Sequence, residues 1–213
     1  MSVKKNIREL RLEINDNIKL VAVSKTKSEA QILEAYKINQ RIFGENKVQE
    51  LVRKYNNLPE DIKWHMIGHL QTNKVKYIAK FVSLIHTVDS IKLIKEINKR
   101  ANNEKRVINC LIQVHIAEEK NKFGFNINEI DDIIKYSKNL ENINIVGLMG
   151  MATFTKNTDI INKEFQVLYK KFKKHKTTNF NTLSMGMSND YQVAIQNGST
   201  MIRLGSTIFG KRN

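Results

Sequence analysis

Short apolar runs alternate with longer amphipathic segments along most of this chain of 213 residues. The short runs are rich in β-branched and other apolar residues and are bounded by polar turns, as buried strands are. The longer segments repeat apolar residues three and four positions apart, which is typical of helices. Strands are predicted over Leu20 to Ser24, Arg41 to Gly44, Lys63 to Ile67, Leu84 to Val88, Asn109 to His115, Asn144 to Met149, Thr182 to Met185 and Met201 to Leu204. Helices are predicted between them over Ser28 to Ile38, Lys47 to Asn56, Thr72 to Lys80, Ile91 to Asn102, Asn128 to Asn139, Asn157 to Lys174 and Tyr191 to Asn197.

This regular alternation of strand and helix predicts parallel strands joined by helical crossovers. Eight such units in a chain of this length fit a closed (β/α)8 TIM barrel, with a doubly wound open sheet as the alternative. The amphipathic segment Val3 to Asn15 adds a helix before the first strand, and no Pro-rich or Ser-rich linker divides the chain. We therefore predict one α/β domain over residues 1–213.

Closure of the barrel would bring the two ends of the sequence together. In a barrel the eighth strand pairs with the first, so the carboxyl ends of these strands become neighbours. Lys25, which follows the first strand, would then lie close to the segment Arg203 to Ser206. Active sites of such barrels form at this carboxyl-terminal face, so we expect the functional residues there.

Composition excludes several classes of protein. With 41% hydrophobic and 27% charged residues, the chain has the composition of a folded globular domain rather than a disordered one. No apolar run is long enough to span a membrane, and the first residues lack the apolar region of a secretory signal, so we expect a cytoplasmic protein. The only cysteine, Cys110, cannot form an internal disulfide and lies in an apolar run, so we expect a buried thiol.

The positive charge raises the alternative of a nucleic-acid-binding protein. The chain carries 36 Lys and Arg against 21 Asp and Glu, which gives a net charge of +15. The excess is mostly Lys and is spread along the whole sequence, and its densest stretch, Lys170 to Lys176, closes a predicted helix, where cations suit the helix dipole. We therefore expect no specific nucleic-acid binding.

Lys25 is the first candidate for chemistry. A lysine amine becomes nucleophilic when burial or a neighbouring cation lowers its pKa, and Lys27 could supply that cation. The natural product of such an amine is a Schiff base with an aldehyde. From position alone, an ordinary surface lysine is the alternative.

The loops after the seventh and eighth predicted strands form a second candidate site, for an anion. They read Ser184 to Asp190 and Arg203 to Thr207, and both combine glycine with hydroxyl side chains. Glycine lets backbone N–H groups approach an anion, and these two loops of a barrel frequently bind phosphate. Each loop by itself could be a simple glycine turn. A phosphate site beside an aldehyde-trapping lysine, however, describes a pocket for pyridoxal 5′-phosphate.

Several motifs in the same order also resemble those of the YggS/PROSC family of pyridoxal 5′-phosphate homeostasis proteins, over nearly the whole chain. They are Val-Ala-Val-Ser-Lys25-Thr-Lys27, Phe43-Gly44-Glu45-Asn46, Trp64-His65-Met66-Ile67-Gly68-His69, Gly147-Leu148-Met149, Leu183-Ser184-Met185-Gly186-Met187-Ser188 and Ile202-Arg203-Leu204-Gly205. The resemblance implies a barrel similar to the N-terminal domain of alanine racemase, with the cofactor held as a lysine Schiff base.

The resemblance also implies roles for individual residues. Lys25 matches the Schiff-base lysine, and Arg203 matches the arginine expected at the pyridine nitrogen. The phosphate positions and the pocket asparagine are matched by Ser188, Gly205, Ser206 and Asn46. The chain departs from the family at Phe123 and over residues 150–153, so no ligand contact is carried over to the loops after strands five and six.

The expected role is to hold the cofactor for intracellular vitamin B6 homeostasis, delivering it to apo forms of enzymes that use it, without strong catalysis. Pyridoxal phosphate is the better electron sink when its ring nitrogen is protonated, which a cationic arginine disfavours. Alanine racemase, which has such an arginine, takes a second base from another domain, whereas this sequence stops at Asn213. A weak amino-acid racemase is the alternative function. We expect a monomer or weak dimer.

His65 and His69 have the spacing of a helical metal pair. They straddle Gly68 at the end of a predicted strand, and no carboxylate or third histidine follows nearby. We therefore expect no metal site.

Overall fold

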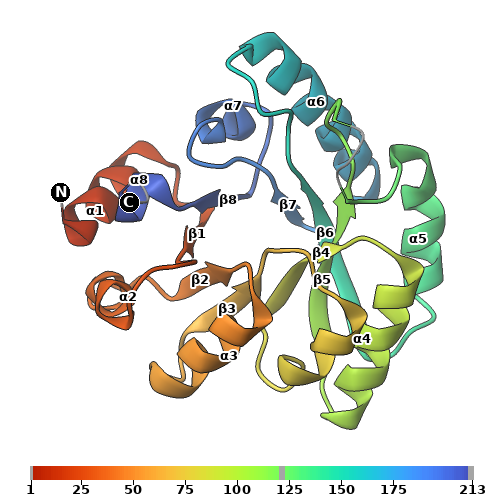
Figure 1. The fold of residues 1–213 in the computed structure, drawn as a ribbon. Helices are drawn as coiled ribbons and strands as arrows, with labels where there is room; N and C mark the ends of the chain where they lie inside the picture. The colour runs from red at the N-terminus through yellow and green to blue at the C-terminus, as the bar shows by residue number, and fades with distance from the viewer. Residues whose placement is uncertain (1, 120–122, 211–213) are drawn as a thin grey trace.

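Eight parallel strands close into a barrel in the computed structural model, which describes residues 2–119 and 123–210 (Figure 1). The strands follow one another around the barrel in sequence order, and β8 pairs with β1. Their bounds are β1 Lys19–Val23, β2 Ile42–Glu45, β3 Lys63–Met66, β4 Leu84–Val88, β5 Ile108–Val114, β6 Ile143–Gly150, β7 Thr182–Ser184 and β8 Met201–Leu204. The predicted TIM barrel is confirmed, and the open sheet is excluded.

Helices connect the strands on the outside of the barrel (Figure 1). They are α1 Val3–Glu13, α2 Glu29–Tyr36, α3 Val48–Asn57, η1 Thr72–Tyr77, α4 Ile91–Asn103, η2 Ile127–Glu129, α5 Ile130–Ser137, α6 Thr158–His175, α7 Tyr191–Gln196 and α8 Ser206–Phe209. Over the described part of the chain, none of them has both the length and the apolarity that crossing a bilayer requires.

The clearest differences from the prediction concern η1 and α8. The predicted α-helix over Thr72 to Lys80 is the shorter 3-10 helix η1, whose buried Val75 lies three residues from the equally buried Ile78. That spacing suits both kinds of helix, so the pattern could not separate them. The four-residue helix α8 was not predicted, because so short a segment shows no helical period.

The first and last elements meet where the barrel closes. Lys19 in β1 is level with Met201 in β8, and Ala22 is level with Leu204. Outside these strands α1 lies beside α8, and the side-chain amide of Asn6 donates to the carbonyl of Ile208 at 2.8 Å (Figure 1). The residues that follow Val23 at the end of β1 therefore lie beside those that follow Leu204 at the end of β8.

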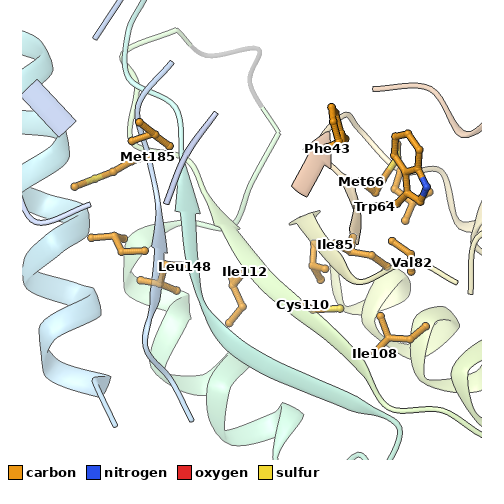
Figure 2. Close-up of a cluster of buried hydrophobic side chains, with 14 of the residues drawn as sticks. Phe43, Trp64, Met66, Val82, Ile85, Ile108, Cys110, Ile112, Leu148 and Met185 are labelled. Atoms are coloured by element: carbon orange, nitrogen blue, oxygen red, sulfur yellow. The ribbon is translucent and has the colours of Figure 1, made fainter. Parts of the chain in front are cut away.

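Side chains alternate between two apolar layers. Between strands and helices lies the larger layer, in which the rings of Phe43 and Trp64 are 5.9 Å apart and Cys110 is buried (Figure 2). The buried thiol predicted for Cys110 is confirmed, and burial raises its pKa. A smaller cluster fills the barrel interior with Val21, Leu84, Leu111, Met149 and Met201. Because side chains alternate along a strand, residues two positions from one of these five also point into the barrel.

Candidate cofactor site

The six residues predicted from sequence line a single pocket of about 330 Å³. The pocket lies at the carboxyl ends of the strands, where barrels carry their functional groups. Those six residues are Lys25, Asn46, Ser188, Arg203, Gly205 and Ser206. The structure therefore brings together positions that span almost the whole sequence.

Strand parity directs Lys25 into the pocket. Val21 belongs to the cluster inside the barrel, and Val23, two residues on, lines the pocket. Lys25 lies two residues after Val23 and also lines the pocket. The strand itself ends at Val23, and the chain turns after Lys25, where Thr26 has a positive φ of 66°. Lys27 also lines the pocket, and its ammonium donates to the carbonyl of Phe209 at 3.3 Å.

A buried ionic cluster holds the backbone on both sides of Lys25. The ammonium of Lys54 donates to the carbonyl of Ser24 at 2.8 Å and to the carboxylates of Glu45 and Glu50 at 2.8 and 2.7 Å. The Ser24 hydroxyl donates to Glu45 at 2.6 Å, and the amide N–H of Thr26 donates to Glu50 at 2.7 Å. Five hydrogen bonds thus form the cluster, and three of them hold Ser24 and Thr26, the residues on either side of Lys25.

Sequence reasoning missed Lys54, which is fully buried. A usable signal was present, because Lys54 follows Val48 and Leu51 at intervals of three on the buried face of α3. A lysine on an apolar helix face requires acidic partners, and Glu50 is one turn away.

The pKa values of the two carboxyl groups in this cluster, Glu45 and Glu50, are shifted in opposite directions. Burial raises the pKa of Glu45, opposed by the hydrogen bonds from Lys54 and Ser24, and its second oxygen, Oε2, is buried without a hydrogen-bond partner. Burial also acts to raise the pKa of Glu50, but the hydrogen bonds from Lys54 and from the Thr26 amide outweigh it and lower that pKa. Glu50 is therefore favoured in its charged form, in which it accepts from Lys54 and from the Thr26 amide.

The loops after β7 and β8 converge on one hydroxyl group. The Oγ of Ser188 accepts the backbone N–H groups of Gly205 at 3.3 Å and of Thr207 at 3.5 Å. Asp190 fixes the same loop by accepting the N–H of Met187 at 2.6 Å. Backbone N–H groups that converge on the Ser188 hydroxyl, together with Ser206 in the pocket lining, are a donor set suited to a phosphate group.

Arg203 is buried at the inner end of the pocket. Its guanidinium donates to the Ser184 hydroxyl at 2.6 Å and to the carbonyl of Gly150 at 3.1 Å. Burial lowers the pKa of Arg203 to about 10, and the nearby charge of Asp190 opposes that shift. The side chain therefore remains a cation at neutral pH.

The histidines predicted to lack a metal role have separate partners. His65 faces the barrel interior, with its Nδ1 3.0 Å from Nε2 of His86, whereas His69 pairs with Asp89 at 3.0 Å. Among residues 2–119 and 123–210, no three His, Cys, Asp or Glu side chains gather as metal ligands would.

Of the two loops that depart from the family pattern, the one after β6 lines the pocket, whereas the described residues of the one after β5 do not. Phe123 stacks on His69 with ring centroids 3.9 Å apart, away from the lining residues. Phe154 lines the pocket although 83% of it is exposed, and the adjoining Thr153 is held by two hydrogen bonds to Glu164. Residues 120–122, which lie in the first of these loops, are outside the described residues.

Gly68 is expected to tolerate no side chain, because it presses against the backbone of Asn46. A Cβ at Gly68 would lie 2.3 Å from the Asn46 carbonyl oxygen. Gly68→Ala should therefore lower the free energy of unfolding by about 1–3 kcal/mol and displace Asn46 from the pocket wall. Chemical denaturation measures the loss. Gly205→Ala is the control for stability, since its Cβ would make an ordinary contact of 3.5 Å with Val23; equal losses in both variants would contradict the steric argument.

Comparison with known proteins identifies the family. The family model for the alanine racemase N-terminal domain matches residues 1–213. The chain belongs to this family. A family member from Aquifex aeolicus (strain VF5), named pyridoxal phosphate homeostasis protein, is 38% identical over 199 residues, covering 91% of this chain and 87% of that protein. The resemblance drawn from the sequence motifs is confirmed.

Solved structures of the family agree with this assignment. PipY of Synechococcus elongatus PCC7942, solved without PLP, is 31% identical with a TM-score of 0.92, and the match covers 98% of this chain and 100% of that one. The structure of PipY with PLP bound is 29% identical with a TM-score of 0.87 at the same coverage. An alanine racemase of Clostridium difficile 630, at 14% identity and a TM-score of 0.82 over 99% of this chain and 57% of that one, shares the barrel fold.

Proposed function

We propose that this protein binds pyridoxal 5′-phosphate as a Schiff base on Lys25 and acts in cytoplasmic vitamin B6 homeostasis, delivering the cofactor to apo-enzymes. Relatives at 35–38% identity over most of the chain are named pyridoxal phosphate homeostasis protein, and PipY has been solved with PLP bound. The family supports binding of the cofactor, and the pocket supports its attachment to Lys25.

One observation carries the assignment of the site: three chemically different groups face one pocket of suitable size. Lys25 offers an amine for an aldehyde, the loops around Ser188 and Gly205 offer N–H donors for a phosphate, and Arg203 offers a cationic donor for a ring nitrogen. The amine of Lys25 forms the covalent bond by attack on the aldehyde carbon, with loss of one water molecule.

Arg203 also accounts for a carrier role in place of catalysis. Bound pyridoxal phosphate supplies an electron sink, which is strong when the ring nitrogen is protonated. A guanidinium facing that nitrogen cannot accept its proton and disfavours a second positive charge there. A racemase function has only the shared barrel in its favour, and a fold by itself carries no activity.

Reduction of the protein loaded with pyridoxal phosphate tests the proposed site. We expect a visible absorption band that borohydride removes, and peptide mapping should place a single adduct on Lys25. Pyridoxal, which lacks the phosphate, is the matched control and should label Lys25 far more weakly at the same concentration. Absence of the band, or label scattered over surface lysines, would contradict the proposal.

A further inference from the structure

Four buried side chains form a hydrogen-bonded chain across the barrel interior, beneath the pocket. Nδ1 of His65 lies 3.0 Å from Nε2 of His86, and Nδ1 of His86 lies 3.1 Å from the hydroxyl of Ser184. The same hydroxyl accepts from the Arg203 guanidinium at 2.6 Å. These residues belong to β3, β4, β7 and β8, and at most 5% of each is exposed. The chain therefore connects opposite sides of the barrel and ends at a pocket residue.

The direction of each hydrogen bond follows from Arg203. A guanidinium can only donate, so the Ser184 oxygen accepts from Arg203. The single hydroxyl hydrogen of Ser184 is then best used toward Nδ1 of His86, which places the one N–H of a neutral His86 ring on Nε2. That N–H donates to Nδ1 of His65. With the opposite direction, the buried hydroxyl hydrogen would have no acceptor among the contacts that the structure shows for Ser184.

The surroundings keep both imidazole rings neutral. Burial lowers the pKa of His65 to about 3, and the positive charges of Lys19 and Lys63 act in the same direction. The pKa of His86 is also lowered, first by burial and then by His65 and Arg203. The Arg203 guanidinium donates to a hydroxyl group and to a backbone carbonyl, and the hydrogen bonds shown for it include no carboxylate.

We propose that Ser184 and His86 are positioning residues that aim the Arg203 guanidinium at the ring nitrogen of the bound cofactor and so keep that nitrogen unprotonated. The inference rests on the proposed function. Two of the five guanidinium N–H groups are committed to Ser184 and Gly150, which fixes the plane of the group while others remain for the pocket. Because this acceptor is a neutral hydroxyl, the chain of hydrogen bonds does not neutralise Arg203, and Asp190 is the nearby negative charge that acts on the guanidinium.

Two substitutions at His86 separate its two hydrogen bonds. Asparagine places an amide oxygen near the position of Nδ1 and can keep the contact to Ser184, whereas glutamine reaches toward the position of Nε2 and His65. His86→Asn, which can keep the contact to Ser184, is thus the matched control for His86→Gln, which cannot. Ser184→Ala removes the acceptor of Arg203 itself. Thermal unfolding of each variant separates general destabilisation from a change at the cofactor.

Nitrogen-15 magnetic resonance of the full chain provides the readout. In the apo-protein we expect Nδ1 of His86 to be unprotonated and Nε2 protonated from pH 6 to 9. With pyridoxal phosphate labelled at the ring nitrogen, the wild type and His86→Asn should give the unprotonated signal. Ser184→Ala and His86→Gln should raise the apparent pKa of that nitrogen by about one to two units.

Three results would overturn the inference. A His86 ring protonated on Nδ1 in the apo-protein would reverse the direction of the chain. An unshifted ring-nitrogen pKa in both Ser184→Ala and His86→Gln would show that the chain does not position Arg203. If the wild type takes up no cofactor at all, the proposed function fails and the positioning role fails with it; a loaded wild type with unshifted variants refutes the positioning role alone.

Discussion

Lys54→Met is expected to lower the free energy of unfolding by about 3–5 kcal/mol, a large effect for one side chain. The substitution is close to isosteric, so packing is kept while the charge is lost. Glu45 would remain buried without its cation, and the Ser24 carbonyl would lose its donor. Equilibrium unfolding in urea measures the change. The same variant should bind pyridoxal phosphate more weakly, since the backbone on each side of Lys25 is released.

Two further variants decide why Lys54→Met is destabilising. The pair Lys5 and Glu9 has the same separation along a helix but is exposed, with its charged atoms 3.7 Å apart, so Lys5→Met should leave stability unchanged. Adding Glu45→Gln to Lys54→Met should recover part of the loss, because the uncompensated carboxylate is removed. If the single variant unfolds at the wild-type concentration of urea, the buried cluster contributes nothing to stability.

The barrel itself was predictable because each strand carries its own signal. A short β-branched run between polar turns marks a strand wherever it occurs, and eight such runs leave few topologies open. Short helical segments were harder to predict from the sequence. The spacing within the η1 helix Thr72–Tyr77 suits both kinds of helix, and the α8 helix Ser206–Phe209 is too short to show a period.

Only those pocket residues could be predicted whose proximity follows from closure of the barrel. Pairing of the first and last strands places Lys25 beside Arg203 and Gly205, and the structure has them around one pocket. The supporting groups were not predicted, because their meaning depends on contacts between elements. The buried position of Lys54 depends on Glu45 and Ser24, which come from the ends of two strands. The place of His86 depends on its link through Ser184 to Arg203, which joins three strands.

Lys25→Ala should abolish the covalent adduct completely, since the nucleophilic amine is removed. The phosphate donors around Ser188 and the Arg203 guanidinium are left in place, so we expect weaker, non-covalent binding that borohydride cannot trap. Absorption spectra and peptide mapping after borohydride treatment measure both effects. Exposed lysines elsewhere on this highly basic chain give the background level of labelling.

Lys25→Arg separates the two contributions of the lysine to binding. It keeps a positive charge at the position but has no amine that can form a Schiff base under these conditions. We expect it to lose the adduct as fully as Lys25→Ala while retaining more non-covalent affinity for an anionic ligand. An adduct of wild-type yield in either variant would place the reactive amine elsewhere, and Lys27, which lines the same pocket, would be the first lysine to map. Because Ser24 and Thr26 are held by Lys54 and Glu50 through backbone groups, both variants should keep the loop in place, so the lost adduct would report on the amine itself.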